Sequence, residues 1–263
     1  MSRIKAKKNL GQHFLTDIII AHKIVNSIDP KPEDNIVEIG SGKGALTEIL
    51  LTHECQVTAI EFDRDLLPAL EIKFGDLNNF TLIARNFLDI EPGDMPAKMK
   101  LIGNIPYNIT TAILEKLFEF KKSVSCAVFM VQSEVADRLT ASPGTRANGS
   151  FTMIMAAGFD IKILFTVKPE SFKPIPRVVS KVIKLIPVSR EPDNFDNFKT
   201  FVRGCFSHKR KTLANSMQMG LKLPKEYCEA LITRISKHVS VRPEQLSFDN
   251  YLKLYEMRCK LEQ

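Results

Sequence analysis

Long apolar runs are missing from this sequence, and that absence limits where the protein can act. No stretch approaches the roughly 20 consecutive apolar residues that a membrane-spanning helix requires. The segment before Thr16 is basic, but no apolar stretch of the signal-peptide type follows it. The sequence therefore predicts a cytoplasmic protein with no membrane partner.

Cysteine is also sparse, which disfavours a disulfide framework and a metal site. No Cys-x-x-Cys occurs, and no group of Cys and His has the spacing of metal ligands. The odd count argues against a closed set of disulfides. We interpret the cysteines as small buried hydrophobic residues and expect no metal. The five residues are Cys55, Cys126, Cys205, Cys228 and Cys259.

Positive charge is what the sequence has in excess, with a formal net charge of +7. A balance of this size indicates a polyanionic partner only weakly. The basic residues, however, gather in three segments: residues 3–8, residues 168–190, where Glu170 is the only acid, and His208-Lys209-Arg210-Lys211. A solvated surface is the alternative for each segment alone. Because the three flank the glycine motif described below, we favour a nucleic acid as the partner.

Apolar periodicity predicts alternating strands and helices over the first two thirds of the chain. Short apolar runs predict strands at 35–39, 57–61, 80–84, 99–103 and 125–131. Helical spacing predicts helices at 16–28, 46–52, 65–74 and 110–120. This alternation implies an α/β fold with a mostly parallel sheet and helices on both faces. Two later strands, at 161–167 and 178–186, would close that sheet as an antiparallel pair.

The pattern changes near residue 190. Residues 187–194 have the composition of a linker. Helices are predicted after it, at 195–206, 209–219, 225–235 and 248–260. The sequence therefore predicts a sheet-containing domain over residues 1–188 and a small all-helical domain over residues 189–263.

A glycine-rich turn, Glu38-Ile39-Gly40-Ser41-Gly42-Lys43-Gly44, follows the first predicted strand. Glycines let the backbone approach a ligand closely, and ligands of open α/β sheets bind at the carboxyl ends of the strands. Glu61 ends the next strand, where an acid can accept hydrogen bonds from both ribose hydroxyls of a nucleoside. Gly40, Gly42 and Ala45 also fit a loose dinucleotide pattern, and a tight turn without ligand is a further alternative. The acid at Glu38 favours S-adenosylmethionine, which carries positive charge and an amino-acid tail.

A second motif, Gly103-Asn104-Ile105-Pro106-Tyr107, follows another predicted strand and is expected at the same edge. The N6 lone pair of adenine is delocalised into the ring, so this amine is a poor nucleophile. Two acceptors, the Asn104 side-chain oxygen and the Ile105 carbonyl, would draw the nitrogen toward tetrahedral geometry. Pro106 would hold that carbonyl in place, and Tyr107 would stack on an extruded adenine. A simple turn is the alternative for the tetrapeptide alone, but its position after a strand favours methylation of an exocyclic amine.

With these motifs the sequence resembles the small-subunit ribosomal RNA adenine dimethyltransferases of the KsgA type, over nearly its whole length. The resemblance implies a Rossmann-like methyltransferase sheet with a small helical domain behind it, using S-adenosylmethionine. It also implies dimethylation of two adjacent adenosines near the 3′ end of small-subunit rRNA, on an assembling particle. No feature suggests an obligate dimer, so we expect a monomer. The similar segments are Asn9–Leu15, Glu38–Thr47, Asn104–Thr110, Phe172–Ser180, Phe201–Asn215 and Arg242–Ser247.

The resemblance further implies roles for individual residues. Phe172 corresponds to a second stacking face for the target base, with a core phenylalanine as the alternative. The basic run of the C-terminal signature, Lys209, Arg210 and Lys211, is expected to contact RNA. Cofactor contacts are implied for His13, Leu15, Gly40, Gly42, Glu61, Asn86 and Asn104.

Two positions depart from the family pattern. The family usually has Asn where His13 stands, and either the ring or the backbone of His13 could contact the cofactor. It has Asp where Asn86 stands, and that Asp would accept a hydrogen bond from the adenine amine of the cofactor. Asn86 can still accept through its carbonyl oxygen, which predicts weaker binding rather than none.

Two other functions stay open from the sequence. One is a large-subunit rRNA adenine N6-methyltransferase that confers antibiotic resistance. The other is a non-catalytic rRNA-binding assembly factor of the same fold. The segments 172–178 and 209–213 favour the small-subunit enzyme over the first, and the intact motif at Asn104 argues against the second.

Overall fold

The structure is a computed structural model that describes residues 6–7, 11–208, 210–236 and 238–261. The chain divides into two compact units, Met1–Ala136 with Ile161–Pro187, and Asp137–Asp160 with Val188–Gln263. The structure thus groups Asp137–Asp160 with the C-terminal part, because the helix in this segment packs against C-terminal helices. The domain boundary at residues 188 and 189 stays a prediction.

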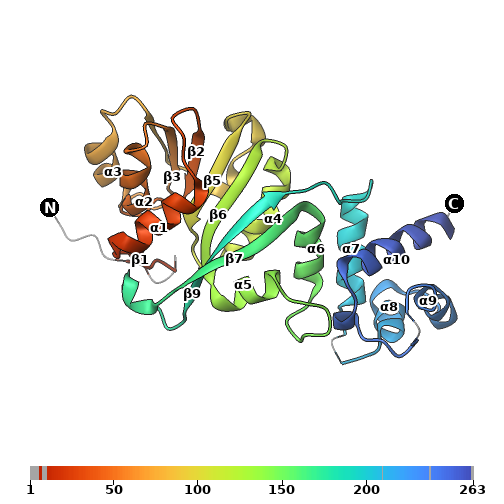
Figure 1. Cartoon of the computed structure of the whole chain (residues 1–263). Helices are drawn as coiled ribbons and strands as arrows, with labels where there is room; N and C mark the ends of the chain where they lie inside the picture. Colours follow the sequence, from red (N-terminus) through yellow and green to blue (C-terminus); the bar gives the residue numbers. More distant parts are fainter. Residues whose placement is uncertain (1–5, 8–10, 209, 237, 262–263) are drawn as a thin grey trace. The chain divides into compact units, whose positions relative to one another are not determined.

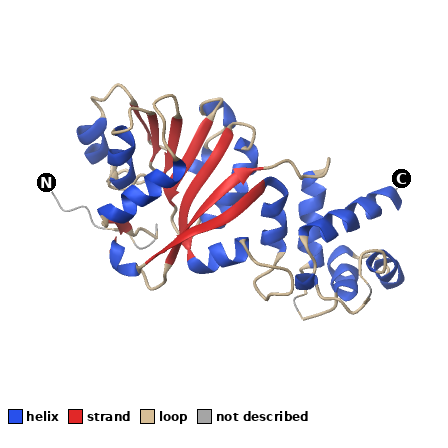
Figure 2. Cartoon of the chain, in the orientation of Figure 1, coloured by secondary structure: helices blue, strands red, loops and turns tan. Residues whose placement is uncertain are grey.

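A seven-stranded sheet forms the centre of the first unit (Figure 2), in the order β4-β3-β2-β5-β6-β9-β7. Its strands β2 to β6 are parallel, and β9 pairs antiparallel with β6. The mostly parallel sheet is therefore confirmed, and the two late strands do extend one edge of it. The strands are β2 (Asn35–Ile39), β3 (Gln56–Ile60), β4 (Phe80–Ile83), β5 (Met99–Asn104), β6 (Val124–Gln132), β7 (Phe159–Val167) and β9 (Ser180–Pro187).

Helices α1 and α2 cover one face of this sheet and share a hydrophobic core with it (Figure 1). Helix α1 begins after Asp17 because the Asp17 carboxylate accepts from the backbone N–H groups of Ile19 and Ile20. Ile24 of this helix is fully buried, and such burial stabilises a fold by about 1.5–3 kcal/mol. The predicted helices are confirmed with bounds α1 (Ile18–Ile28), α2 (Ala45–Leu51), α3 (Leu67–Phe74) and α4 (Thr110–Phe120).

Several short elements have no counterpart in the sequence-based expectation. Two helices, α5 (Ser133–Leu139) and α6 (Ser150–Gly158), lie between β6 and β7. A separate two-stranded sheet pairs β1 (Phe14–Leu15) with β8 (Phe172–Lys173), antiparallel. Strands of two residues show no alternation of apolar and polar positions, so no pattern predicts them. Short 3₁₀ turns occur at η2 (Phe87–Asp89), η3 (Pro92–Asp94), η4 (Pro169–Ser171) and η5 (Pro243–Gln245).

The second unit is helical, as predicted for the residues after 190. The expected start of one helix at residue 209 was wrong, because the Thr212 hydroxyl accepts from the Asn215 backbone N–H and so caps the helix later. Among the residues that the structure describes, no helix combines the length and apolar character required to cross a bilayer. The helices are α6, α7 (Phe195–Cys205), α8 (Leu213–Leu221), α9 (Lys225–Ile232) and α10 (Phe248–Leu261).

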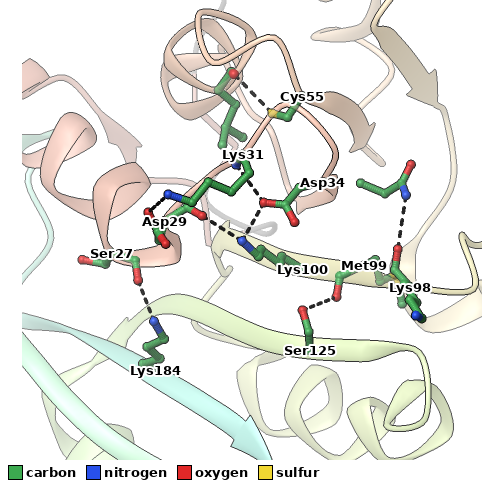
Figure 3. A network of polar contacts seen from close by, with 12 residues as sticks. Ser27, Asp29, Lys31, Asp34, Cys55, Lys98, Met99, Lys100, Ser125 and Lys184 are labelled. Atoms are coloured by element: carbon green, nitrogen blue, oxygen red, sulfur yellow. Dashed lines mark hydrogen bonds and ion pairs between the residues drawn. The ribbon is translucent and has the colours of Figure 1, made fainter.

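Paired charges surround the amino ends of β2 and β5 in the first unit (Figure 3). Lys100 Nζ lies 2.6 Å from Asp34 Oδ2 and 2.8 Å from the Asp29 carbonyl oxygen. Lys31 forms an ion pair with the Asp29 carboxylate at 2.9 Å. The Lys100 and Asp34 side chains are only 16% and 18% exposed, so their pairing compensates for lost contact with water.

Candidate active site

A pocket opens where β2, β3 and β5 end. The structure brings together here all the predicted cofactor residues and residues 104–107 of the second motif, although they are far apart in the sequence. Their roles at this pocket stay predictions. The lining consists of residues 11–15, Glu38, residues 40–43, Ala45, Leu46, residues 61–63, Leu66, Asn86 and residues 104–109.

The turn after β2 depends on glycine. Gly40 and Gly42 have φ angles of +72° and +60°, in the left-handed region that other residues rarely adopt. A Cβ atom on Gly42 would also lie 3.3 Å from the ring of Phe14. This backbone path turns the Gly42 N–H toward Glu61, whose Oε2 accepts from it at 2.8 Å.

The Glu61 carboxylate is buried and held by backbone donors at both oxygens. Oε1 accepts from the Asp63 N–H at 2.8 Å, and Oε2 from Gly42. Burial raises the Glu61 pKa, and the hydrogen bonds from these two N–H groups oppose that rise. A carboxylate oxygen accepts more than one hydrogen bond, so Glu61 can still accept from ligand hydroxyls.

Glu38 is a second acid below this turn, and it lacks a positive partner. Its side chain is buried and accepts a hydrogen bond from the Thr47 hydroxyl. The Glu38 pKa is raised to about 8, and burial is the largest cause. The Thr47 hydrogen bond opposes this rise, and the charge of Glu61 adds to it. Within the described part of the chain, no basic side chain forms an ion pair with Glu38 or Glu61. A positively charged ligand in the pocket would therefore favour the ionised forms of these two acids.

Ser41, within the glycine turn, adds an unsatisfied hydroxyl that sequence analysis did not single out. Its Oγ is buried and has no hydrogen-bond partner among the described residues. A buried polar atom without a partner is unfavourable. Ser41 lines the pocket, so a polar ligand there could supply the missing hydrogen bond.

The acceptors expected at Asn104 and Ile105 are available. Asn104 Nδ2 donates to the His13 carbonyl oxygen at 2.8 Å, which leaves the side-chain oxygen as an acceptor. The Ile105 side chain is buried, and its N–H donates to the Met130 carbonyl at 3.2 Å. No described residue donates to the carbonyl oxygen of Ile105 or the side-chain oxygen of Asn104.

Tyr107 is held rigidly beside these acceptors. Its hydroxyl lies 2.6 Å from Ser180 Oγ, and its ring stacks on the His13 ring with centroids 5.6 Å apart. Burial raises the Tyr107 pKa, which the Ser180 hydrogen bond partly opposes. Tyr107 is therefore a neutral aromatic ring with a fixed orientation. Sequence analysis missed Ser180, for which only its place in the family-like segment gave a signal.

The structure separates the contacts of the His13 backbone from those of its ring. The backbone carbonyl fixes the amide of Asn104. The ring stacks on Tyr107, and Nδ1 lies 2.7 Å from the Pro174 carbonyl oxygen. Because a carbonyl oxygen only accepts, Nδ1 is the donor. His13 therefore holds two residues of the predicted catalytic motif in position.

Asn86 and Phe172 have surroundings that sequence analysis did not foresee. Asn86 begins η2, and its Oδ1 accepts from the Leu88 N–H at 3.1 Å, while the residue also lines the pocket. Phe172 is fully buried in the hydrophobic core, where β8 pairs with Leu15. The ring of Phe172 therefore has no exposed face for a base in this structure, which supports the core alternative and corrects the expected stacking role.

A further group of side chains, missed in the sequence, closes one wall of the pocket. Lys7 Nζ lies 2.6 Å from Asp63 Oδ1 and 2.6 Å from Asp65 Oδ2, and Gln12 Nε2 donates to Asp63 Oδ2 at 2.6 Å. Burial raises the Asp63 pKa, but the hydrogen bonds from Lys7 and Gln12 outweigh it, so the pKa lies below its usual value. These contacts fasten the segment before β1 to the loop after β3.

The predicted RNA contacts lie in the second unit. Arg210 and Lys211 are exposed, and Lys209 lies outside the described residues. In the described part of the chain, no three His, Cys, Asp or Glu side chains gather as they would around a metal ion.

Comparison with known sequences finds relatives along the whole chain. The profile of the ribosomal RNA adenine dimethylase family matches residues 3–258. A ribosomal RNA small subunit methyltransferase A from Parabacteroides distasonis is 37% identical, covering 97% of this chain and 94% of the relative. The protein of that name from Levilactobacillus brevis is 38% identical, covering 96% and 90%.

Solved structures with the same fold include a dimethyladenosine transferase and an rRNA methyltransferase. A dimethyladenosine transferase from Plasmodium falciparum superposes with a TM-score of 0.82 at 27% identity, over 94% of this chain and 98% of the other. The 23S rRNA methyltransferase ErmE superposes with a TM-score of 0.72 at 25% identity, over 95% and 100%. A Rossmann-like methyltransferase sheet is thereby confirmed for this chain.

Proposed function

This chain belongs to the ribosomal RNA adenine dimethylase family, and we propose that it dimethylates N6 of two adjacent adenosines near the 3′ end of small-subunit rRNA. The methyl donor is S-adenosylmethionine. The observation that carries this proposal is the Asn104 amide, whose nitrogen is held by the His13 carbonyl and whose oxygen is left as an acceptor in the pocket.

The chemistry of the pocket fits this cofactor. Glu61 has a fixed carboxylate for the two ribose hydroxyls, and the Ser41 hydroxyl has no partner in the described part of the chain. A positively charged ligand beside Glu38 and Glu61 would stabilise their ionised forms, which burial otherwise disfavours. His13, Leu15, Gly40, Gly42 and Asn86 complete the proposed contacts. When bound, S-adenosylmethionine supplies an electrophilic methyl group.

The residues at the carboxyl end of β5 make the target amine more nucleophilic. The Asn104 side-chain oxygen and the Ile105 carbonyl accept its two hydrogens, which localises the lone pair on nitrogen. Pro106 has a fixed φ and holds the preceding carbonyl, and Tyr107 stacks on the extruded base. After transfer the nitrogen carries a positive charge and loses a proton readily, so the site needs no strong base.

The substrate is proposed to be an assembling small ribosomal subunit, met in the cytoplasm by a monomer without a membrane partner. Residues 1–188 form the catalytic domain in this proposal, and residues 189–263 recognise RNA. Lys209, Arg210 and Lys211 contribute positive charge for phosphate groups.

Transfer of a labelled methyl group tests the proposal. The protein is incubated with labelled S-adenosylmethionine and either small subunits isolated without the modification or naked large-subunit rRNA. We expect label on adenosine N6 in the small subunit only. Label on the large-subunit RNA would favour the resistance enzyme instead, and no label on either would favour a non-catalytic assembly factor.

A further inference from the structure

The loop between β8 and β9 is attached at both ends to the proposed stacking surface. At its start, the Pro174 carbonyl accepts from His13 Nδ1 at 2.7 Å. At its end, Ser180 Oγ lies 2.6 Å from the Tyr107 hydroxyl. His13 and Tyr107 stack on each other. The loop of residues 174–179 therefore borders the ring on which the target adenine is proposed to lie.

This loop has a stiff backbone. Pro174 and Pro176 have fixed φ angles, and a residue that precedes a proline is restricted to extended conformations. Pro176 is buried, and the Val179 carbonyl accepts from the Ser133 N–H at 3.0 Å. The backbone of Ile175, between the two prolines, is thus restricted to extended conformations.

Apolar side chains project from the loop into solvent. Ile175 is 63% exposed, Val178 42% and Val179 38%. One exposed aliphatic residue requires no explanation. Three within five residues, presented by a stiff loop beside a proposed active site, form an apolar surface that an ordered partner could cover.

The charge around this surface indicates which partner covers it. Lys173 and Arg177 are exposed beside the apolar residues. The sequence contains no acidic residue between Glu170 and Glu191. Cations that alternate with apolar side chains match a chain of phosphates and flat bases. The loop is also hydrogen-bonded to His13 and Tyr107, which line the pocket proposed for an rRNA adenosine.

We propose that residues 174–179 form a wedge that enters the rRNA beside the target adenosine. Ile175 occupies the gap that the extruded base leaves in the stack, Val178 contacts the neighbouring base, and Lys173 and Arg177 contact phosphates. Removal of a base from its stack costs a few kcal/mol. Aliphatic side chains inserted between bases offset such a cost in other nucleic-acid complexes. This inference rests on the proposed function and adds the device that extrudes the base.

Fluorescence and kinetics with Ile175→Ser test the wedge. Unmodified small subunits are reconstituted with 2-aminopurine at the target position, whose fluorescence rises when the base leaves the stack. We expect this rise with the wild type and its loss with the variant. On unmodified small subunits that carry adenosine, kcat/KM should fall about tenfold to a hundredfold, the equivalent of losing one buried isoleucine side chain. The Kd of the variant for S-adenosylmethionine should stay within about twofold of the wild-type value.

Two further variants distinguish insertion of Ile175 from the general effect of changing an exposed side chain. Ile72 on α3 is 73% exposed, and Ile72→Ser should leave fluorescence and kcat/KM unchanged. Arg177→Gln should weaken binding to the particle and reduce its dependence on salt, yet preserve the fluorescence rise at saturating protein.

Specific outcomes would overturn the wedge. A full fluorescence rise and wild-type kcat/KM with Ile175→Ser would contradict it, and so would an equal loss with Ile72→Ser. A matching loss of affinity for S-adenosylmethionine would show that the loop supports the pocket rather than contacting RNA. Failure of the proposed function is distinct, because the wild-type protein would then transfer no methyl group to the small subunit.

Discussion

The two ends of the central strands differ in how their charges are balanced. At the amino ends, Lys100 pairs with Asp34, and Lys31 with Asp29. At the carboxyl ends, the buried Glu38 and Glu61 have no basic partner among the described residues, and the hydroxyl of Ser41 in the same pocket has no hydrogen bond.

This difference separates a structural end of the sheet from a functional one. Burial of a charge costs solvation free energy, and an ion pair in the folded protein offsets part of this cost. Buried acids without a basic partner lack this offset, and groups whose pKa values are shifted in this way are characteristic of functional sites. The comparison predicts that loss of a paired charge at the amino end lowers stability, whereas loss of a proposed ligand contact at the carboxyl end lowers binding and catalysis.

The largest effect is expected at the carboxyl end of β5. Asn104→Ala removes the side-chain acceptor for the target amine, and we expect methyl transfer to fall by about a hundredfold to a thousandfold, as when a single catalytic hydrogen-bonding group is lost elsewhere. Co-sedimentation with small subunits should be nearly unchanged, because most of the proposed RNA contacts lie elsewhere, at residues 173–178 and 209–211. Single-turnover transfer measures the effect, and wild-type turnover would contradict the proposed mechanism.

Glu61→Gln should have the next largest effect, on cofactor binding. A neutral amide replaces the charged acceptor proposed for the ribose hydroxyls, and hydrogen bonds to charged groups contribute about 1.5–3 kcal/mol. The Kd for S-adenosylmethionine, measured by calorimetry, should therefore rise about tenfold to a hundredfold. An unchanged Kd would remove Glu61 from the cofactor site.

At the amino end, Lys100→Met should lower stability and leave cofactor binding intact. The change leaves the half-buried Asp34 without its ion pair, and we expect a loss of about 1–3 kcal/mol in urea unfolding. Lys73→Met, in the exposed pair with Glu48, is the matched control and should cost less than about 1 kcal/mol. A rise in the Kd for S-adenosylmethionine as large as that of Glu61→Gln would contradict the division between the two ends.

The last prediction concerns the pH dependence of stability at the carboxyl end. The pKa of Glu38 is raised from 4.5 to about 8 by burial, so the folded state binds more protons than the unfolded state between these values. The free energy of unfolding of the wild type should therefore fall as the pH rises through that interval. Glu38→Gln cannot ionise, so its stability relative to the wild type should increase up to about pH 8 and then level off.

Urea unfolding at several pH values measures the Glu38 effect. Glu71→Gln, at an exposed position on α3, is the control and should show no such trend. Parallel curves for the wild type and Glu38→Gln would mean that Glu38 does not carry a raised pKa.

The sequence predicts the parts of the site that follow strands. Gly40, Glu61 and Asn104 each stand at the end of a predicted strand, and parallel strands bring their carboxyl ends to one edge. The strand order need not be known for these residues to be grouped. This is why the pocket and its main acids could be anticipated.

Contacts made by irregular segments could not be anticipated. The β1–β8 pairing, the hydrogen bond from His13 to Pro174 and the ion pair of Lys7 with Asp63 join segments without periodicity. The burial of Phe172 likewise depends on tertiary packing, which a family-like motif does not specify. The start of α8 at Leu213 depended on a cap within a sequence that favours helix throughout.

The modified-base map of rRNA from cells that lack this protein tests the central claim most directly. We expect two adjacent N6,N6-dimethyladenosines near the 3′ end of small-subunit rRNA to disappear, and to return when the wild-type protein, but not Asn104→Ala, is restored. An unchanged small-subunit map, with a methyl group lost from large-subunit rRNA or from neither, would contradict the account.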